Sequence, residues 1–429
     1  MDISIIGTGY VGLVSGVCFA ELGHNVMCID NNKAKVEMLL NDVIPIYEPG
    51  LEELVKANRR EKRLSFSTDI KDGVEHGKII FIAVDTPSKP NGEADLSFVE
   101  EVSRQIAGHL KEYRLIVEKS TVPVQTGEWV MKTIKETVQP GVEFDVASNP
   151  EFLREGTAIN DFLKPDRVII GVTSDRAASL LVKLYEPLNA PLLITDIRSA
   201  ELIKHSANAF LAVKISFINS IANICDIVGA DVAKVARGIG LDKRIGMHFL
   251  NAGVGYGGSC FPKDVSAFIN ISDHIGYDFK ILKSIQEVNY EQHKVPVDKL
   301  KRALGDLKGR KIAMLGLTFK PDTDDLRNAP SLAIVKLLQQ EGAEVRAYDP
   351  VSMKKAGELI KDVIFCKDSY EAAKDADAVL IVTEWSQFRF LDLHKLKGLM
   401  KRALIVDGRN IYDPARVKAM GFEYHGIGR

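Results

Sequence analysis

The first thirty residues constrain the fold of this chain more than any other part of it. A strand-like run at 2–6 leads directly into a G-x-G-x-x-G loop at 7–12. An amphipathic segment at 13–23 follows, and a second strand-like run at 25–29 ends at Asp30. Glycine loops are common by themselves, but strand, loop, helix, strand and terminal acid in this order are typical of a dinucleotide-binding βαβ unit.

The glycine loop and the acid together predict which dinucleotide binds. Glycines allow the tight turn and let a pyrophosphate approach the N-terminus of the following helix. Asp30 would accept hydrogen bonds from the adenosine ribose hydroxyls and would repel a 2′-phosphate, so NAD is favoured over NADP. The alternatives are a structural βαβ turn that binds no ligand and, for Asp30 itself, a solvated loop acid.

Alternating strand-like and helix-like segments continue along the chain and recur in its last third. The first series has further strand-like runs, at 78–84, 114–118, 144–148, 167–172 and 191–195. The second, smaller series has a helix at 331–341 and strands at 310–316, 344–348, 378–383 and 403–407. Such alternation predicts mostly parallel sheets with helices on both faces.

A long helix is expected between the two series, because the stretch from Ser199 to about Gly229 has apolar positions at helical spacing and no internal Pro or Gly. The fold class is therefore α/β, with two Rossmann-like doubly wound parallel-sheet domains joined by a long central helix. We expect a dinucleotide-binding domain at 1–198, a helical region at 199–300 that carries Cys260 and makes a dimer contact, and a second α/β domain at 301–429.

Composition excludes several classes of function. The 429 residues are 46% hydrophobic and 27% charged with a net charge of −2, so neither nucleic acid nor a membrane is an expected partner. Five cysteines without Cys-x-x-Cys spacing predict reduced thiols and a cytoplasmic location. No signal peptide is expected, because the sequence begins with a strand-like run. Nine scattered histidines show no zinc pattern and the acidic run at 322–325 reads as a solvated loop, so no metal site is expected.

Cys260 lies in the glycine-rich segment 253–264 and is the most chemically informative residue. Pro262 suits the first position of a helix that starts there. The thiol would then lie at the positive end of a helix dipole beside Lys263, and both effects favour the nucleophilic thiolate. The alternative is a glycine-rich turn that carries a buried structural cysteine.

Three other segments carry candidate chemistry. Thr121 falls at the carboxyl end of a strand, where open α/β sheets bind ligands. The segment 149–155 also follows a strand and contains two carboxylates. Lys204 and Asn208 share a face of the long helix among apolar neighbours. The alternatives are a helix N-cap for Thr121, a solvated charged loop for 149–155, and a solvated lysine beside an asparagine that bonds its own helix.

A thiol beside a dinucleotide site points beyond simple alcohol dehydrogenation. A thiolate adds to an aldehyde to give a thiohemiacetal, which loses a hydride to give a thioester that water hydrolyses. Lys204 and Asn208 would stabilise the oxyanions, and Asp264 or Glu151 would position or activate the water.

Seven segments, taken in order, resemble the UDP-glucose/GDP-mannose dehydrogenase family of nucleotide-sugar dehydrogenases. They are GTGYVG at 7–12, KSTVP at 119–123, NPEFLREG at 149–156, the helix with Lys204 and Asn208, GYGGSCFPKD at 255–264, GLTFKPDTDDLRNAPS at 316–331 and DGRN at 407–410. The resemblance covers essentially the whole chain, and the sequence around the cysteine is closest to the branch that acts on UDP-glucose. It implies an NAD-dependent four-electron oxidation of UDP-glucose to UDP-glucuronate through a thiohemiacetal and a thioester on Cys260, followed by hydrolysis.

The resemblance also implies a role for each site residue. The catalytic set is Cys260, Lys204, Asn208, Asp264, Thr121 and Glu151. The NAD-binding set is Gly7, Gly9, Tyr10, Val11, Gly12, Asp30, Lys35, Thr86, Thr121, Glu155, Lys263 and Arg327. The substrate-binding set is Glu151, Phe152, Leu153, Arg154, Glu155, Lys204, Asn208, Arg244, Phe249, Leu250, Asn251, Ala252, Gly253, Gly257, Lys320 and Arg409.

One feature of the substrate set has a physical reason as well, and another implies an oligomer. Lys320 and Arg409 follow strands of the second α/β domain, where a diphosphate needs positive charge, although each by itself reads equally as a surface cation. Arg244 is expected to reach the site of a partner subunit, so the resemblance implies a homodimer or higher homo-oligomer.

Three other functions remain open at this point. A sibling enzyme would act on GDP-mannose or a UDP-N-acetylhexosamine. A two-electron hydroxyacid dehydrogenase would need no thiol. An NAD-responsive scaffold protein would produce no NADH with any nucleotide sugar.

Overall fold

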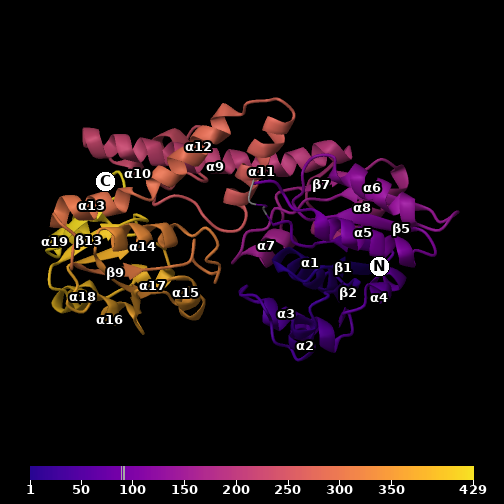
Figure 1. Ribbon diagram of the computed structural model, residues 1–429, viewed down its shortest axis with the longest axis horizontal. Coiled ribbons are helices and arrows are strands. Elements are labelled where there is room, and N and C mark those ends of the chain that lie inside the picture. Colours follow the sequence, from indigo (N-terminus) through magenta and orange to yellow (C-terminus); the bar gives the residue numbers. More distant parts are fainter. Residues whose placement is uncertain (88, 90–91) are drawn as a thin grey trace. The chain divides into compact units, whose positions relative to one another are not determined.

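The computed structural model describes residues 1–87, 89 and 92–429, and Figure 1 labels many of its helices and some of its strands. The chain forms two compact units. The N-terminal unit comprises Met1–Ala207 and Ser266–Ile271, and the C-terminal unit comprises Asn208–Val265 and Ser272–Arg429.

Within the described residues, eight strands form the sheet of the N-terminal unit, in the order β3-β2-β1-β4-β5-β6-β7-β8. All neighbours are parallel except β6 and β7, which are antiparallel. The strands are β1 (Asp2–Ile6), β2 (Asn25–Ile29), β3 (Leu64–Ser67), β4 (Ile79–Ile82), β5 (Arg114–Glu118), β6 (Phe144–Ser148), β7 (Val168–Gly171) and β8 (Leu192–Thr195). The order 3-2-1-4-5-6 is that of a doubly wound dinucleotide-binding fold.

Helices cover both faces of this sheet, because its buried strands present apolar side chains on both sides. One core lies under α1 (Tyr10–Glu21), α3 (Leu51–Arg60), α7 (Ala158–Leu163) and α8 (Asp175–Tyr185). The other lies under α4 (Ile70–His76), α5 (Ser97–His109) and α6 (Thr126–Thr137). On β1, Ile3 and Ile5 belong to the first core and Ile6 to the second. The remaining helical segments of this part are α2 (Lys33–Leu40) and the 3-10 turn η1 (Glu186–Leu188).

The C-terminal unit repeats the same strand order in a smaller sheet. The described strands follow the order β11-β10-β9-β12-β13-β14, all parallel. They are β9 (Lys311–Leu315), β10 (Glu344–Tyr348), β11 (Val363–Phe365), β12 (Ala378–Ile381), β13 (Leu404–Asp407) and β14 (Glu423–Gly426). The helices are α10 (Val232–Gly240), α12 (Lys280–Gln292), α13 (Val295–Leu304), α14 (Pro330–Gln340), α15 (Met353–Leu359), α16 (Ser369–Ala373), α17 (Ser386–Arg389), α18 (Leu393–Leu399) and α19 (Pro414–Ala419).

The end of β10 in this second sheet carries an acid in the same place as Asp30 after β2. Asp349 Oδ2 accepts hydrogen bonds from the N–H groups of Leu317, at 2.8 Å, and of Thr318, at 3.1 Å. It also accepts one from Trp385 Nε1 at 3.2 Å, and Asp349 is fully buried. This acid therefore supports the turn after β9 and is closed off by an indole ring.

The predicted long helix is α9 (Ile197–Val228), and both α9 and α11 (Phe261–His274) contribute residues to both units. By length and composition alone α9 could cross a membrane, a test that the core helix of a soluble protein also passes. Two ionisable residues of α9, Glu201 and Lys204, are buried in the N-terminal unit. Its later residues Ile218 and Ala222 belong to a hydrophobic core of the C-terminal unit.

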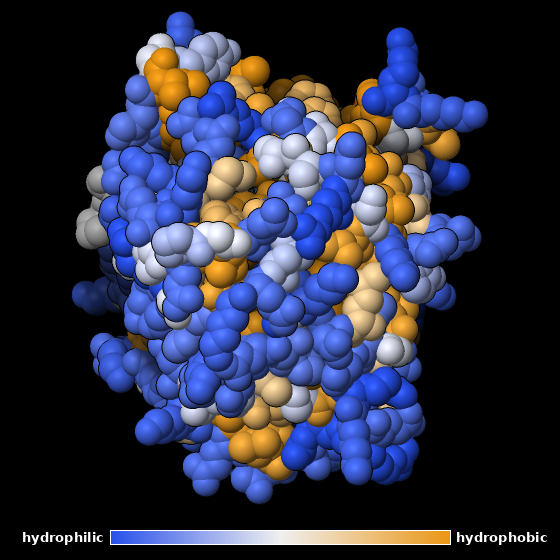
Figure 2. Space-filling view, turned by 90° about the vertical axis from the view of Figure 1, so that its right-hand side faces the viewer, coloured by the Kyte–Doolittle hydropathy of each residue, from blue (hydrophilic) through white to orange (hydrophobic). Residues whose placement is uncertain are grey.

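The predicted fold class is confirmed, with differences at its margins. β1, β2, β5 and β6 have the predicted bounds, and the helix predicted at 331–341 is α14, one residue earlier. The sequence did not predict β3, β11 or β14. The face of the molecule in Figure 2 is largely hydrophilic, with hydrophobic residues in smaller groups, as its mixed charge composition led us to expect.

Candidate active site

The glycine loop after β1 has the geometry that a dinucleotide requires. Gly7 has a φ of 100°, and a Cβ at Gly12 would lie 1.9 Å from the Gly7 carbonyl oxygen, so both positions need glycine. The helix α1 begins at Tyr10 with no side-chain cap at Gly9 and no acid in its first turn. Its first N–H groups can therefore bind a pyrophosphate, which fits NAD.

Asp30 directly follows β2 and is held by its neighbours. Its Oδ2 accepts hydrogen bonds from Thr8 N at 2.9 Å and Thr8 Oγ1 at 2.7 Å and pairs with Lys35 Nζ at 3.0 Å. Burial by itself raises the pKa of Asp30, but hydrogen bonds from Thr8, Asn32 and Lys35 bring that pKa below its ordinary value. The solvated-acid alternative is therefore wrong, since a fixed carboxylate lies beside the glycine loop.

Asp30→Asn should weaken discrimination against NADP. The variant removes the negative charge but keeps a hydrogen-bond acceptor, and Lys35 remains nearby to attract a 2′-phosphate. We expect the ratio of kcat/KM for NADP to that for NAD to rise about tenfold, which corresponds to about 1.4 kcal/mol of lost repulsion. Steady-state kinetics with both cofactors measure it, with Asp2→Asn as the control. An unchanged ratio would contradict the role of Asp30.

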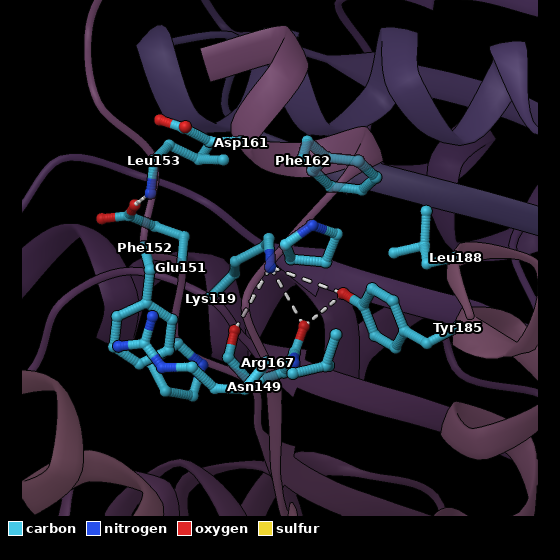
Figure 3. Close-up of a pocket in the computed structure, with 13 residues that line it drawn as sticks. Lys119, Asn149, Glu151, Phe152, Leu153, Asp161, Phe162, Arg167, Tyr185 and Leu188 are labelled. Atoms are coloured by element: carbon cyan, nitrogen blue, oxygen red, sulfur yellow. Dashed lines mark hydrogen bonds between the residues drawn. The ribbon is translucent and has the colours of Figure 1, made fainter. Parts of the chain in front are cut away.

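The predicted carboxylate site forms within the N-terminal unit. Lys204 Nζ lies 2.9 Å from Glu151 Oε1, and both side chains are only 5% exposed. Glu151 Oε2 accepts a hydrogen bond from Leu153 N at 2.5 Å (Figure 3). The guanidinium of Arg167 lies 3.6 Å from the centre of the Phe152 ring, and Lys204 Nζ lies 5.3 Å from it. The alternatives of a solvated charged loop and a solvated lysine are wrong here.

Other predicted residues of this unit have contacts that the sequence did not suggest. Thr86 Oγ1 donates to the Thr121 carbonyl at 3.0 Å, which links two predicted NAD residues. Thr121 is not a helix N-cap, because Gln125 occupies that position of α6. Arg154 pairs with Asp161 at 2.5 Å.

Tyr10 Oη donates to the buried Glu48, which the sequence analysis missed. The Glu48 carboxylate accepts from the N–H groups of Gly156, at 2.6 Å, and Ala158, at 2.7 Å. The predicted NAD residue Tyr10 is therefore connected through Glu48 to the end of the NPEFLREG segment. A lone acid in a loop gave no sequence signal for this role.

Cys260 immediately precedes α11 in the C-terminal unit, so the thiol lies at a helix N-terminus as predicted. The helix starts at Phe261, which makes Pro262 its second residue rather than its first. The residue Cys260 is partly exposed, and its Sγ lies 3.5 Å from Ser259 Oγ. The alternative of a buried structural cysteine is therefore wrong.

Asn208 and Asp264 form a buried pair, and Asp264 lies four residues beyond this thiol. Asn208 Nδ2 donates to Asp264 Oδ2 at 2.6 Å, and Lys263 Nζ lies 3.4 Å from Asp264 Oδ1. Asp264 N donates to the Cys260 carbonyl at 2.8 Å, so the carboxylate is one helical turn beyond the thiol. Asn208 thus fixes an acid of the predicted catalytic set.

The glycine segment before Cys260 is held by buried amides of α9 and α12. Gly253 N donates to Asn219 Oδ1 at 2.8 Å, and Gln292 Nε2 donates to the Gly253 carbonyl at 2.8 Å. A Cβ at Gly257 would lie 2.3 Å from the Asn328 carbonyl oxygen. The glycines are therefore required by the packing of the chain itself as well as by any ligand.

Within the predicted UDP-binding stretch, the side chains differ in exposure. Leu250 and Ala252 belong to a hydrophobic core and leave only their backbone for a ligand. Phe249 has a φ of 64°, in the left-handed region, and Asn251 is exposed.

The two predicted phosphate-binding cations lie at the carboxyl edge of the second sheet. Arg409 is mostly buried, and its guanidinium donates to the carbonyls of Phe319, at 3.1 Å, and Gly255, at 3.3 Å. Arg409 is therefore not an ordinary surface cation. Lys320 Nζ lies 5.6 Å from the centre of the Phe319 ring.

Arg244 and Arg327 each pair with a neighbouring acid. Arg244 is 88% exposed and lies 2.5 Å from Asp242, whereas Arg327 lies 2.9 Å from Asp325. In the acidic run, Asp324 pairs with Lys355. The side chains that the structure describes contain no cluster of three or more His, Cys, Asp or Glu that could hold a metal.

Glu118, at the end of β5, makes the stability of the fold depend on pH. Burial raises its pKa to about 8, so the folded protein retains a proton that the unfolded chain has released above about pH 4.5. Stability should therefore fall as pH rises through this window. Compared with Glu118→Gln, we expect the wild type to lose up to about 1.4 kcal/mol per pH unit between about pH 5.5 and 7.5. Urea titrations of both proteins measure this difference, and parallel curves would contradict it.

A strand order of 3-2-1-4-5-6, an uncapped glycine loop and a fixed acid after the second strand define a dinucleotide-binding protein of the NAD type. Comparison with known proteins specifies the family. Three consecutive domains of the UDP-glucose/GDP-mannose dehydrogenase family match the chain, namely the NAD binding domain at 1–189, the central domain at 198–291 and the UDP binding domain at 313–414. The chain therefore belongs to this family.

Individual relatives are similar to this chain over its whole length. A UDP-glucose 6-dehydrogenase of Bacillus subtilis (strain 168) is 50% identical over 428 residues, covering 100% of this chain and 93% of the relative. One from Rhizobium meliloti (strain 1021) is 50% identical over 436 residues, covering 100% of both chains. The structure of a UDP-glucose dehydrogenase from Pyrobaculum islandicum has a TM-score of 0.93 and 41% identity, covering 100% of this chain and 98% of that one. The predicted family and the predicted cofactor, NAD, are confirmed.

Proposed function

We propose that this chain is an NAD-dependent dehydrogenase that oxidises UDP-glucose to UDP-glucuronate in two successive steps. The observation that carries the proposal is the partly exposed Cys260 thiol at the N-terminus of α11, one turn before an acid fixed by Asn208. It is supported by full-length similarity to proteins named UDP-glucose 6-dehydrogenase. An oxidation that stopped at the aldehyde or ketone would need no nucleophile.

Different residues of the chain act in different steps of this reaction. NAD, when bound, would supply the hydride acceptor for both oxidations at C6 of the sugar. Cys260 Sγ adds to the C6 aldehyde to form a thiohemiacetal, whose oxidation gives a thioester. Lys204 and Asn208 stabilise the oxygen that carries negative charge, and Glu151 with Thr121 positions the water that releases UDP-glucuronate and the thiol. Asp264 assists at the thiol.

The remaining predicted residues bind the two nucleotides. The NAD-binding set extends from Gly7 to Arg327, and the UDP-binding set comprises the stretch Phe249–Gly253 with Gly257, Lys320 and Arg409. We also propose the functional division into 1–198, 199–300 and 301–429, with NAD bound by the first part and the UDP-sugar by the last.

We also propose a homodimer, and an apolar stripe on α9 supports it. Phe210, Phe217 and Ile224 recur every seven residues and are 65%, 52% and 53% exposed. Exposed aromatic and aliphatic side chains in one row are typical of a subunit interface. A second copy of the chain would cover this stripe and bring the exposed Arg244 to the partner's site. The five cysteines, all within the described residues, form no disulfide with one another, which supports the proposed cytoplasmic location.

Counting the NADH formed per UDP-glucose consumed tests the proposal. The double oxidation gives two NADH and one UDP-glucuronate, whereas a two-electron dehydrogenase gives one NADH. A panel of GDP-mannose and UDP-N-acetylhexosamines distinguishes a sibling enzyme by its higher kcat/KM. Absence of NADH with every nucleotide sugar would indicate a binding protein instead.

A further inference from the structure

A buried lysine lies beside the carboxylate site, and the proposed reaction does not use it. Lys119 directly follows β5 and is almost fully buried. Its Nζ lies 3.0 Å from Asn149 Oδ1, 3.3 Å from the Asn149 carbonyl oxygen and 3.5 Å from Tyr185 Oη (Figure 3). Burying an ammonium group destabilises the fold unless hydrogen-bond partners compensate. The presence of Lys119 at this buried position therefore needs an explanation.

Asn149, which receives these contacts, is held in place by three further hydrogen bonds. Its Nδ2 donates to the Ile169 carbonyl at 2.8 Å, and its Oδ1 accepts from Tyr185 Oη at 2.5 Å. Its backbone N–H donates to the Glu118 carbonyl at 2.9 Å. Lys119 and Asn149 therefore connect β5, β6, β7 and α8 at one point, and Glu151 follows only two residues later.

The charges around Glu151 give Lys119 an electrostatic role as well. Burial lowers the pKa of Lys119 to about 8, while Glu151 raises that pKa and Lys204 lowers it. The two lysines therefore both act on the Glu151 carboxylate. A cavity of about 40 Å³ has Lys119, Glu151, Arg167 and Tyr185 among its lining residues. This volume is enough for a water molecule beside Glu151.

We propose that Lys119 is a positioning residue for the hydrolysis step, because its ammonium group anchors Asn149 and thereby fixes Glu151, the acid proposed to position the hydrolytic water. This inference rests on the proposed function, in which Glu151 positions that water. Lys119 does not touch the substrate in this scheme. It acts through the segment that carries the acid.

Lys119→Met tests the proposal, since methionine keeps most of the apolar stem and removes the cation. We expect kcat to fall about 10- to 100-fold while KM for UDP-glucose and for NAD changes less than about threefold, the pattern of a displaced catalytic group. Rapid mixing should show a burst of two NADH per site at the wild-type rate, followed by slow turnover. In the wild type, kcat should fall as the pH rises through about 8, where Lys119 loses its proton. In Lys119→Met this fall should be absent.

Two further variants control this experiment. Lys132→Met removes an exposed lysine of α6 and should leave kcat, the burst and the pH profile unchanged. Tyr185→Phe keeps the charge but removes the hydroxyl bonded to Asn149, and it should lower kcat about 3- to 10-fold with the same burst. If Lys119→Met does not fold, the kcat and the burst of Tyr185→Phe decide whether the anchoring of Asn149 matters for hydrolysis.

The outcomes separate this inference from the proposed function. Wild-type protein that yields one NADH per UDP-glucose overturns the double oxidation and this inference with it. If wild-type protein yields two NADH, then a variant kcat within twofold of wild type, or a burst slowed as much as turnover, overturns the role of Lys119 alone.

Discussion

Cys260→Ser is expected to abolish the release of UDP-glucuronate. Serine keeps the size and the position before α11, but its hydroxyl is far less ionised and less nucleophilic than a thiol. Loss of a catalytic nucleophile lowers turnover by on the order of 10³- to 10⁶-fold. Chromatography of the products after incubation with UDP-glucose and NAD measures the acid directly.

The matched control for this experiment is Cys225→Ser. Cys225 lies on α9 in a hydrophobic core and has no proposed role in the reaction. The control should retain acid production, and only its stability should change. Release of UDP-glucuronate by Cys260→Ser at more than about one hundredth of the wild-type rate would contradict a covalent intermediate on this sulfur.

Among the proposed variants, Lys204→Met should have the second largest effect on turnover, after Cys260→Ser. It removes the cation 2.9 Å from Glu151 and leaves that carboxylate buried without its charge partner. Breaking a buried ion pair from one side costs about 3–5 kcal/mol of stability. Loss of oxyanion stabilisation should lower kcat by about 100- to 1,000-fold. Urea unfolding and steady-state kinetics measure the two effects separately.

A double variant separates stability from catalysis at this pair. Lys204→Met combined with Glu151→Gln removes both charges, so much of the lost stability should return while activity stays low. Lys183→Met, an exposed lysine of α8, serves as the control and should change neither quantity. Recovery of activity in the double variant would show that the pair is only structural.

The sequence predicted the central strands well but missed three of the four edge strands of the described sheets, the exception being β8. β1 and β2 are buried apolar runs that end at a glycine and an acid, so their bounds follow from local pattern. β3, β11 and β14 lie at the edges of the sheets. The run Val363–Phe365 has only three residues, and only its pairing with β10 defines it as a strand. Such pairing is a tertiary property that periodicity does not report.

The sequence named the candidate site residues one by one, but it did not predict their contacts. Lys204 and Glu151 are 53 positions apart in the sequence, and no local pattern indicates that they meet. Lys119 stood in the KSTVP motif next to Thr121, and a charge directly after an apolar strand could have marked it. Tyr185 gave no such signal, because its hydroxyl meets Asn149 only once α8 packs on the sheet.

The indole of Trp385 over Asp349 bears on how many cofactors one chain can hold at a time. In the part of the chain that the structure describes, the second sheet repeats the strand order of the first, but its corresponding acid is sealed and its turn lacks the glycine pattern. A single dinucleotide site must then serve both oxidations. Spent NADH has to leave and fresh NAD has to enter midway, and a covalent tether to the protein would keep the half-oxidised sugar from escaping during that exchange.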